Sequence, residues 1–386
     1  MNSKNTKKLL FILSFLLPII IMFIVYALLN QWPLGEKSLI VDWDIKEQYS
    51  NYFAYLKTVL KGENNFIYSF SKVLGGDFIG LAGYYLLSPF NILFLILDNL
   101  KLEIVIFIIT LLKLGASGLT FNLFISKKFK VSYYNLLFST SYALMAYNIV
   151  YQQNLMWLDG IILLPLVILG IDNIIEDKSF LLYAISLALA IFSNYYIGYM
   201  IGIISIIYFF YAISFKIKIP LKENLKKVLK KSLVFLGYTV ISVGSVLFLL
   251  LPIFESLEGG KGPNKSNELL LNFKFAFNPI EFLSKLYTGA FSWHEVMDGF
   301  PLIFCGWLVT IYFLLFFLNN NFSKEERIKS LFLVIILVLS MQVTAFINVW
   351  HGFNLPTGFP ARNSFIFFFH DLLCIQEFFV LSEHKP

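Results

Sequence analysis

Long apolar runs separated by short basic clusters constrain the fold of this chain more than any other feature of its sequence. A transmembrane helix needs roughly 20 consecutive apolar residues. The clearest runs of this kind cover residues 9–29, 102–125, 232–253, 301–319, 331–349 and 363–381. Such a series predicts a chain that crosses a membrane several times.

Three weaker stretches add to this series. Residues 133–150 and 157–174 each have the composition of a span, and 180–215 is long enough for two short helices joined by a tight turn. We therefore predict an all-α polytopic membrane protein with about ten transmembrane helices, folded as a single transmembrane domain over residues 1–386.

Composition narrows the class of protein further. Apolar residue types make up 58% of the chain and charged types 14%, whereas soluble domains have about 45–50% and 25%. A soluble globular enzyme, a disordered chain and a nucleic-acid-binding module are therefore excluded, and the lipid bilayer is the expected surrounding. The net charge of +6 does not restore nucleic acid as a partner, because the basic residues lie in short clusters between apolar segments.

The segment 84–97 decides the predicted orientation, because it has only 14 residues and contains Pro89. Runs of this length are more often re-entrant or interfacial than membrane-crossing. Lys and Arg crowd the cytoplasmic loops of membrane proteins. If 84–97 does not cross, the N-terminus shares one side with all the basic clusters, which cover residues 4–8, 127–130, 216–231 and 324–329. We therefore predict that this segment dips into the outer leaflet and that both chain ends are cytoplasmic.

This topology leaves three outer loops, at about 30–101, 254–300 and 350–362. In the first loop, apolar residues recur at steps of three and four over 44–60, which predicts an amphipathic helix. Such a helix lies flat on the outer membrane surface, with its apolar stripe toward lipid or toward the bundle. The stripe consists of Ile45, Tyr49, Tyr52, Phe53, Leu56 and Leu60.

Three carboxylates of the first loop are candidates for chemistry. Asp42 and Asp44 form a D-x-D pattern, which often chelates a divalent ion beside a sugar phosphate. Asp44 with Glu47 also matches a helix capping box in all but its first residue type, so capping and chemistry both stay open. Asp77 follows two glycines, where it is either a turn residue or a second polar group in an outer cavity.

Three further polar residues stand out against their apolar neighbours. Arg362 is one of two arginines and lies at the outer mouth of a predicted span, where it either binds phosphate or only extends to the membrane surface or caps a helix. Asp159 lies near the start of a span, so it is a functional candidate unless it pairs with Gln152, Asn154 or a neighbouring helix. His351 on the third outer loop is either a site residue or a solvated loop residue.

Several short motifs occur in an ordered series along nearly the whole chain. They are D-x-x-x-Q-Y at Asp44, Gln48 and Tyr49, followed by motifs at 68–69, 74–76, 84–91, 156–160, 164–166, 194–199, 351–356 and 362–365. In this order the set resembles the YfhO family of bacterial membrane proteins. Family members are usually longer, so the resemblance implies a short or truncated member.

The resemblance implies a GT-C type glycosyltransferase fold in the bacterial cytoplasmic membrane. Such enzymes take a hexosyl or N-acetylhexosaminyl unit from a polyprenyl-phosphate donor. They attach it to an extracytoplasmic acceptor, here an envelope polymer such as lipoteichoic acid. They carry an acidic residue in the first outer loop, which fits Asp44 or Asp42.

These considerations predict a role for each candidate. Asp44 is the expected general base, with Asp42 as its partner or as a metal ligand, and Arg362 is expected to bind the phosphate. The remaining predicted substrate-binding residues are Gln48, Tyr49, Asp77, Asp159 and His351. No cofactor is assigned with certainty, and Mg²⁺ or Mn²⁺ held by Asp42 and Asp44 stays open. The alternatives are a transporter or flippase for a lipid-linked substrate and a non-catalytic scaffold for envelope assembly.

Overall fold

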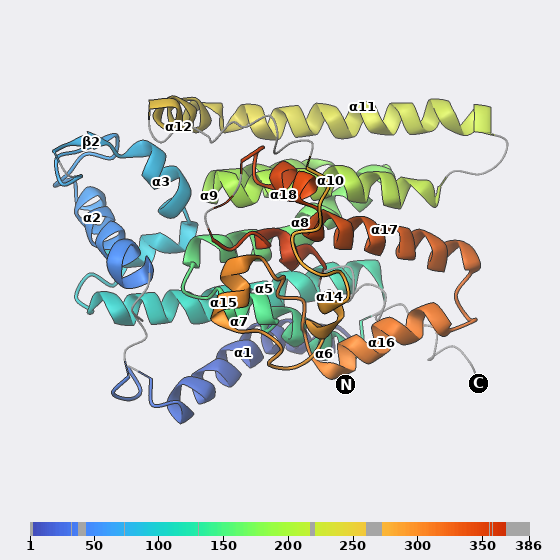
Figure 1. Ribbon diagram of the computed structural model, residues 1–386, viewed down its shortest axis with the longest axis horizontal. Helices are drawn as coiled ribbons and strands as arrows, with labels where there is room; N and C mark the ends of the chain where they lie inside the picture. Colours follow the sequence, from blue (N-terminus) through green and yellow to red (C-terminus); the bar gives the residue numbers. More distant parts are fainter. Residues whose placement is uncertain are drawn as a thin grey trace.

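The chain forms a mostly helical bundle in a computed structural model (Figure 1). The structure describes residues 3–31, 33–37, 44–72, 74–129, 131–216, 221–259, 272–354, 356 and 358–367. Asp42 and most of the predicted span 363–381 lie outside these described residues.

The helices and strands follow one another with short connections over most of the chain. In chain order they are α1 (Ser3–Leu28), η1 (Ile45–Tyr49), α2 (Ser50–Leu60), β1 (Tyr68–Ser69), β2 (Gly76–Asp77), α3 (Ile79–Tyr85), η2 (Pro89–Ile92), α4 (Leu93–Ile96), α5 (Leu102–Lys128), α6 (Tyr134–Ala143), α7 (Ala146–Val150), α8 (Leu155–Ile175), α9 (Leu181–Ser193), α10 (Tyr195–Ser214), α11 (Leu221–Ser245), α12 (Leu247–Gly259), α14 (Glu281–Ser284), α15 (Trp293–Asp298), α16 (Trp307–Leu318), α17 (Lys324–Gln342), α18 (Thr344–Trp350) and η3 (Arg362–Ser364).

Five of the described helices are long and apolar enough to cross a membrane, namely α1, α5, α8, α10 and α11. The bent pair 79–85 and 89–96 would make a sixth if it crossed. Helices α1, α5 and α8 confirm the helices predicted at 9–29, 102–125 and 157–174. The run 180–215 forms two helices, α9 and α10, which meet at Asn194 as the sequence predicts. The predicted number of ten spans is not confirmed by the described residues.

Four predicted spans differ from single straight helices. The runs 133–150, 232–253 and 331–349 are interrupted at 144–145, 246 and 343 respectively, and in 301–319 the helix begins only at Trp307. A backbone hydrogen bond joins two of these irregular segments, because the Ala146 N–H donates to the Phe304 carbonyl at 2.9 Å. At the third break, the Thr344 N–H donates to the Lys274 carbonyl at 3.0 Å. The irregular backbone inside the bundle therefore finds protein partners, as backbone at membrane depth must.

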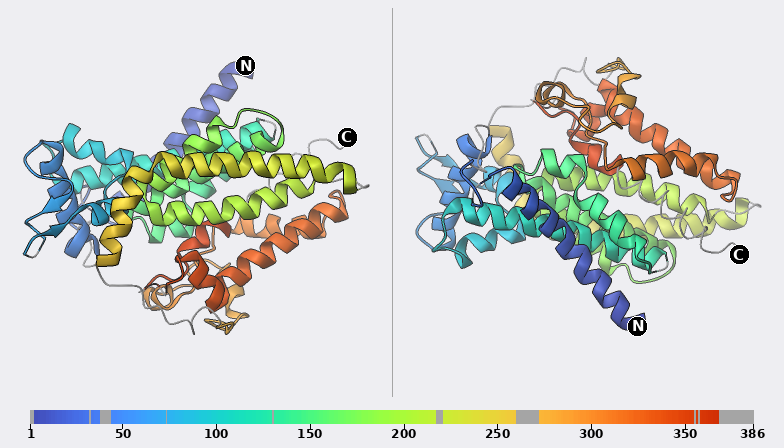
Figure 2. Two further views of the ribbon diagram at one scale, coloured as in Figure 1. Left: turned by 90° about the horizontal axis from the view of Figure 1, so that it is seen from above. Right: turned by 90° about the horizontal axis from the view of Figure 1, so that it is seen from below.

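Helix α8 is the centre of the bundle. It packs against α5, α9 and α10, while α1 covers α5 and α11 covers α9 (Figures 1 and 2). Most residues of α8 are buried on all sides, which fits a helix whose sequence is apolar around its whole circumference. The end of α8 that begins at Leu155 therefore has a fixed position, and the candidate site is built around it.

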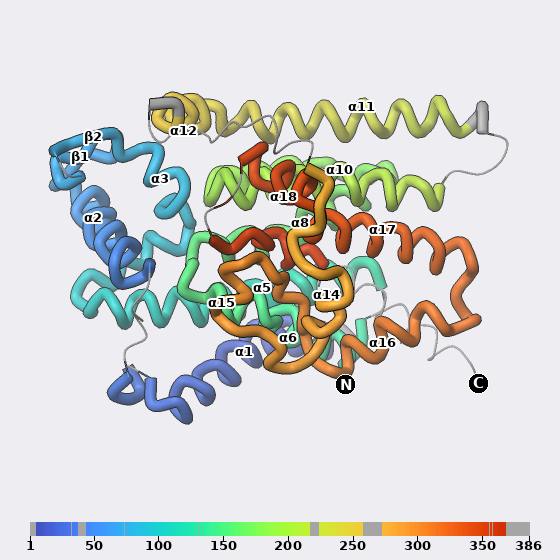
Figure 3. Tube along the Cα trace, viewed as in Figure 1, coloured from blue at the N-terminus to red at the C-terminus, as the bar shows by residue number. Residues whose placement is uncertain are grey.

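Residues 44–72 and 74–96, which belong to the predicted first outer loop, cap one end of the bundle (Figure 3). The predicted helix over 44–60 is confirmed as a π-helical turn, η1, continued by α2. Its stripe residues Ile45, Tyr49, Phe53 and Leu56 are buried in the main core, so the stripe faces the bundle. The rings of Phe53 and Phe94 stack at 4.8 Å, which fixes α2 against α4. The segment from α3 to α4 turns through 105° near Pro89.

Close packing between α9 and α10 depends on Gly198. A Cβ atom at this position would lie 2.5 Å from the Cα atom of Ile191. Gly202 is one turn further along α10, and no atom lies within 4 Å of a Cβ placed there. The two glycines thus differ in packing but share one helix.

We predict that Gly198→Ala lowers the free energy of unfolding by about 1–3 kcal/mol, because the added methyl group forces α9 and α10 apart. Gly202→Ala should be neutral or stabilising by up to about 1 kcal/mol, because alanine favours a helix over glycine. Thermal unfolding of both variants in detergent measures the difference. Equal melting temperatures for the two variants would contradict the observed helix contact.

Candidate functional site

A cavity of about 500 Å³ lies where the first outer loop meets the start of α8, the start of α10 and the loop after α18. Aromatic rings form most of its wall. The cavity is lined by Asp44, Gln48, Tyr49, Tyr84, Tyr85, Trp157, Tyr196, His351, Asn354, Pro356, Phe359 and Arg362. Segments from both halves of the chain therefore build one site.

Asp44 stands at the rim of this cavity. Its carboxylate accepts hydrogen bonds from Gln48 Nε2 at 3.3 Å and from the Tyr49 hydroxyl at 3.1 Å. A π-helical turn brings residues five apart into register, so η1 places Tyr49 next to Asp44. Asp44 makes no capping hydrogen bond, so the alternative that it caps the helix together with Glu47 is wrong. Its carboxylate faces the cavity instead.

Tyr49 connects the first outer loop to α8. Its hydroxyl also lies 2.9 Å from Asn154 Oδ1, at the start of that helix. A phenol has one proton, so it donates either to Asn154 or to Asp44. Burial raises the pKa of Tyr49, with the neighbouring Tyr85 and Asp44 acting in the same direction, and the hydroxyl therefore keeps its proton at neutral pH. The Asp44 carboxylate thus has a protonated phenol beside it, shared with Asn154.

Arg362 lines the same cavity. Its guanidinium group donates to the carbonyls of Gly358 at 3.1 Å and Phe359 at 3.2 Å. It also lies 5.1 Å from the ring centres of Trp157 and Tyr196, between which it is held by cation–π attraction. Gly358 and Phe359 both have positive φ angles, 71° and 52°, which bend the loop around the guanidinium group.

Tyr84 joins the two walls of the cavity. Its hydroxyl accepts a hydrogen bond from Arg362 Nη1 at 3.1 Å and another from Trp157 Nε1 at 3.2 Å. Asn194 holds the backbone of Tyr84, because its Nδ2 donates to the Tyr84 carbonyl at 2.7 Å. The other side-chain atom of Asn194 caps α10 by accepting from the Ile197 N–H at 2.8 Å. One asparagine therefore sets the start of α10 and the position of α3 together.

His351 is buried at the edge of the cavity and holds the loop that carries Arg362. Its Nε2 lies 2.6 Å from the Pro360 carbonyl, which only accepts, so the proton is on Nε2. Its Nδ1 therefore accepts from the Tyr196 hydroxyl. Burial lowers the pKa of His351 to about 4, so the ring is neutral at physiological pH. Both ring nitrogens are used in positioning the loop, and His351 is not the solvated loop residue that the sequence left open.

Asp159 does not line the cavity. Its carboxylate forms an ion pair with Lys113 of α5 at 2.7 Å and accepts from the Ser88 hydroxyl at 2.9 Å. Lys113 also donates to the Leu155 carbonyl at 2.8 Å, and both members of the pair are buried. The alternative of a partner on a neighbouring helix is therefore confirmed for Asp159. Lys113 was missed, although an isolated lysine inside an apolar run is a signal for such a pair.

Asp77 is also remote from the cavity lining. One carboxylate oxygen accepts from the Ile79 N–H at 3.1 Å, and the other accepts from the Ser256 hydroxyl. This arrangement agrees with the turn-residue alternative. Asp42, the remaining predicted site residue, lies outside the described residues.

The cavity holds one carboxylate and one guanidinium group among mainly aromatic side chains. In the described part of the chain, no three His, Cys, Asp or Glu side chains lie close enough together to hold a metal ion. The sequence argument did not assign Tyr84, Tyr85, Tyr196 or Phe359 to the site. The paired tyrosines at 84–85 and 195–196 were visible in the motif series, but tyrosines of a membrane protein are also common at its interfaces.

Comparison with known proteins identifies one family. The model of the family described as "Bacterial membrane protein YfhO" matches residues 14–384, nearly the whole chain. No curated protein and no solved structure matches the chain.

We predict that breaking the Lys113–Asp159 pair destabilises the bundle strongly. Lys113→Met or Asp159→Asn each leaves a buried partner without its charge complement, which costs about 3–5 kcal/mol. The double variant Lys113→Met/Asp159→Leu should recover most of this loss, because no buried charge remains. Thermal unfolding of the three variants in detergent measures the effect.

The exposed pair of Glu176 and Lys178 is a matched control, since exposed ion pairs contribute little to stability. Glu176→Gln should leave the melting temperature nearly unchanged. If the buried double variant were as unstable as the two single variants, the pair would not be the reason for the loss.

Proposed function

The chain belongs to the YfhO family of bacterial membrane proteins, and we propose that it is a glycosyltransferase of the cytoplasmic membrane. In this proposal a polyprenyl-phosphate sugar is the donor, and a hydroxyl of an envelope polymer such as lipoteichoic acid is the acceptor. The observation that carries the proposal is that Asp44 and Arg362 line the same aromatic cavity. The transfer requires a base to remove the acceptor proton and a cation to stabilise the departing phosphate, and this cavity has one candidate for each.

Asp44 is the proposed general base. The acceptor oxygen forms a bond to the anomeric carbon, and its proton moves to the Asp44 carboxylate. A base must lie within hydrogen-bond reach of the proton that it removes, and the position of Asp44 in the cavity wall permits this. Hydrogen bonds from Gln48 and Tyr49 fix the carboxylate while leaving lone pairs for the acceptor.

Arg362 is the proposed phosphate ligand. When the bond between the anomeric carbon and the phosphate oxygen breaks, the electron pair and negative charge remain on the lipid phosphate. A guanidinium group has five N–H donors, and three of those of Arg362 are used by Gly358, Phe359 and Tyr84. The remaining donors suit phosphate oxygens. Because its loop and two aromatic rings hold Arg362 in advance, little reorganisation is needed as charge develops.

The aromatic rings of the lining support a sugar ligand. Tyr85, Trp157 and Tyr196 offer flat apolar faces against which the C–H groups of a hexose can pack, and they line the same cavity as the proposed base and the proposed phosphate ligand. Ligand cavities commonly combine such apolar walls with a few fixed polar groups.

The proposed orientation places this cavity on the extracytoplasmic side, with the N-terminus in the cytoplasm. Support comes from the lysines, which gather at the opposite ends of the long helices: Lys127 and Lys128 end α5, and Lys226 and Lys227 lie near the start of α11. Positive charge is enriched on the cytoplasmic side. We further propose that the segment from α3 to α4 dips into the membrane and returns without crossing, consistent with its 105° bend.

A divalent cation held by Asp42 and Asp44 stays an open alternative. Asp44 is the single carboxylate that lines the cavity among the described residues, and Asp42 is not described. Arg362 is the cation that the cavity itself supplies. If Mg²⁺ or Mn²⁺ is required in addition, EDTA should abolish transfer and the ion should restore it.

We predict that Asp44→Asn lowers sugar transfer by at least about 100-fold, because general bases contribute about 10²–10⁴-fold. Arg362→Ala should lower transfer by about 10²–10³-fold through loss of charge stabilisation. The assay follows label from a polyprenyl-phosphate sugar to envelope polymer in membranes that contain the full chain. Asp298→Asn is the control, because this exposed carboxylate lies outside the cavity lining.

The same variants separate the proposed transferase from its alternatives. A transporter or a scaffold would keep its function in Asp44→Asn, provided that the variant inserts into the membrane and has the melting temperature of the unaltered protein. Unchanged transfer in Asp44→Asn would refute the assigned base, and the absence of transfer by the unaltered protein would refute the proposed reaction.

The orientation gives a separate prediction. In a background with Cys305→Ala and Cys374→Ala, Glu63→Cys in the first outer loop should react with an impermeant thiol reagent added outside intact cells. Lys226→Cys at the start of α11 should react only after the membrane is opened. The reverse labelling pattern would place the cavity in the cytoplasm, where the proposed envelope acceptor is absent.

A further inference from the structure

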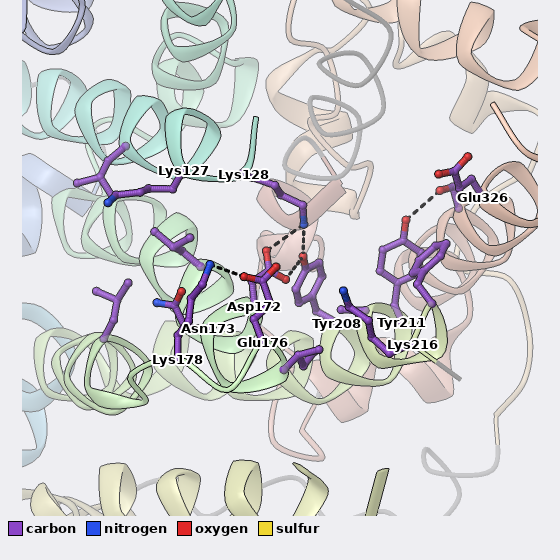
Figure 4. A pocket seen from close by; sticks show the side chains of 17 residues that line it. Lys127, Lys128, Asp172, Asn173, Glu176, Lys178, Tyr208, Tyr211, Lys216 and Glu326 are labelled. Carbon is purple, nitrogen blue, oxygen red and sulfur yellow. Dashed lines mark hydrogen bonds and ion pairs between the residues drawn. The ribbon is translucent and has the colours of Figure 1, made fainter. Parts of the chain in front are cut away.

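A second and larger cavity lies at the lysine-rich end of the bundle (Figure 4). Its volume is about 760 Å³, and the ends of α5, α8 and α10 form its wall together with the beginnings of α9 and α17. It is lined by Leu123, Lys127, Lys128, Leu169, Asp172, Asn173, Ile175, Glu176, Lys178, Leu182, Tyr208, Tyr211, Ala212, Phe215, Lys216, Glu326 and Ser330. None of these residues lines the outer cavity.

A charged cluster links three helices across this cavity. Lys128 of α5 lies 3.0 Å from Asp172 of α8 and donates to the Tyr208 hydroxyl of α10 at 2.6 Å. The Tyr208 hydroxyl in turn donates to Asp172 at 2.8 Å. Figure 4 shows the three side chains in contact at the centre of the cavity. Asp172 is therefore fully engaged and contributes little free negative charge.

The other two carboxylates in the lining are engaged as well. Glu176 pairs with Lys178. Glu326 accepts hydrogen bonds from the backbone N–H and the hydroxyl of Ser323 in a capping box at the start of α17. Each carboxylate of the cavity thus already has a donor.

Two lysines remain without a charge complement. In the described residues, neither Lys127 nor Lys216 forms an ion pair. They belong to different segments of the wall, Lys127 to the last turn of α5 and Lys216 to the residues that follow α10. With four lysines and three carboxylates, the lining carries one net positive charge, which a bound anion would neutralise.

Part of the remaining lining is apolar. Leu123, Leu169, Leu182 and Ala212 contribute side chains from four helices to the same cavity. A ligand that satisfies the whole lining must accordingly combine an anionic group with a hydrocarbon part. Inorganic phosphate would meet only the charged half, whereas a phospholipid would meet both.

We propose that this cavity binds a phosphate-bearing head group, supplied by an anionic phospholipid of the leaflet at the lysine-rich end. The head group lies in the positive field of Lys127 and Lys216, which stand on opposite sides of the Lys128–Asp172 cluster (Figure 4), and the acyl chains follow the apolar part of the lining. Basic pockets between transmembrane helices suit such head groups. The inference uses residues that the proposed transfer reaction does not use, so it stands or fails independently of that reaction.

The test measures phosphatidylglycerol binding to the purified full chain in detergent by native mass spectrometry. Lys127→Gln/Lys216→Gln should bind this lipid about 30-fold more weakly, since each lysine near the head group contributes a similar factor. Lys226→Gln/Lys227→Gln removes the same charge from the exposed face of α11 and should bind as the unaltered protein does. Thermal unfolding confirms that both variants are folded.

Two further arms identify the source of the phosphate. Displacement of phosphatidylglycerol by excess inorganic phosphate would support phosphate recognition with a free anion as ligand. Binding that resists inorganic phosphate would support the lipid. Equal losses of phosphatidylglycerol binding in the two double variants would overturn the proposal, because general surface charge would then explain the binding. Equal binding of phosphatidylcholine and phosphatidylglycerol would also overturn it, because the hydrocarbon chains alone would then explain the binding.

Discussion

The buried ion pair of Lys113 and Asp159 is the interaction on which the candidate site depends most. Removing two charges from water is costly, and the pair persists only because each charge is hydrogen-bonded as well as paired. Asp159 accepts from Ser88, directly before the bend between α3 and η2, so the pair fastens this bend to α5 and α8. The bend in turn sets the direction of α3, which carries Tyr84 into the outer cavity.

From this anchored segment, the cavity wall is completed by parts of the chain that are distant in sequence. Tyr84 receives hydrogen bonds from Trp157 on α8 and from Arg362 in the last described loop. His351 then ties that loop to α10 through Tyr196. Each contact joins two segments that no local pattern connects, and together they leave Asp44 and Arg362 facing one space.

The sequence could predict features that depend on neighbouring residues, but not those that depend on contacts between residues distant along the chain. Apolar runs located α1, α5 and α8, because hydrophobicity is a local property. The breaks at Met145, Val246 and Val343 could not be located, since these residues are themselves apolar. At the first and third breaks, the next residues donate backbone hydrogen bonds to the remote Phe304 and Lys274 carbonyls, which no local pattern reveals. The capping interpretation of Asp44 failed because a π-helical turn, invisible in residue spacing, supplied Tyr49 as a closer partner. Arg362 entered the site as expected, whereas the partner of Asp159 needed knowledge of the packing between α5 and α8.

Comparison of two cations explains why Arg362, and not Lys113, marks the proposed reaction centre. The charge of Lys113 is neutralised by Asp159, so this lysine is already paired and is not a binding site for a substrate anion. Among the described residues, Arg362 has no carboxylate partner and is held only by carbonyls, a phenol and two aromatic rings. Those groups solvate a guanidinium group without neutralising it. An anion that enters this cavity can therefore form charge-assisted hydrogen bonds with a cation that no carboxylate of the described residues neutralises. The phosphate of a lipid-linked sugar is the anion that we propose, and its departure beside Arg362 is the step that this charge would favour.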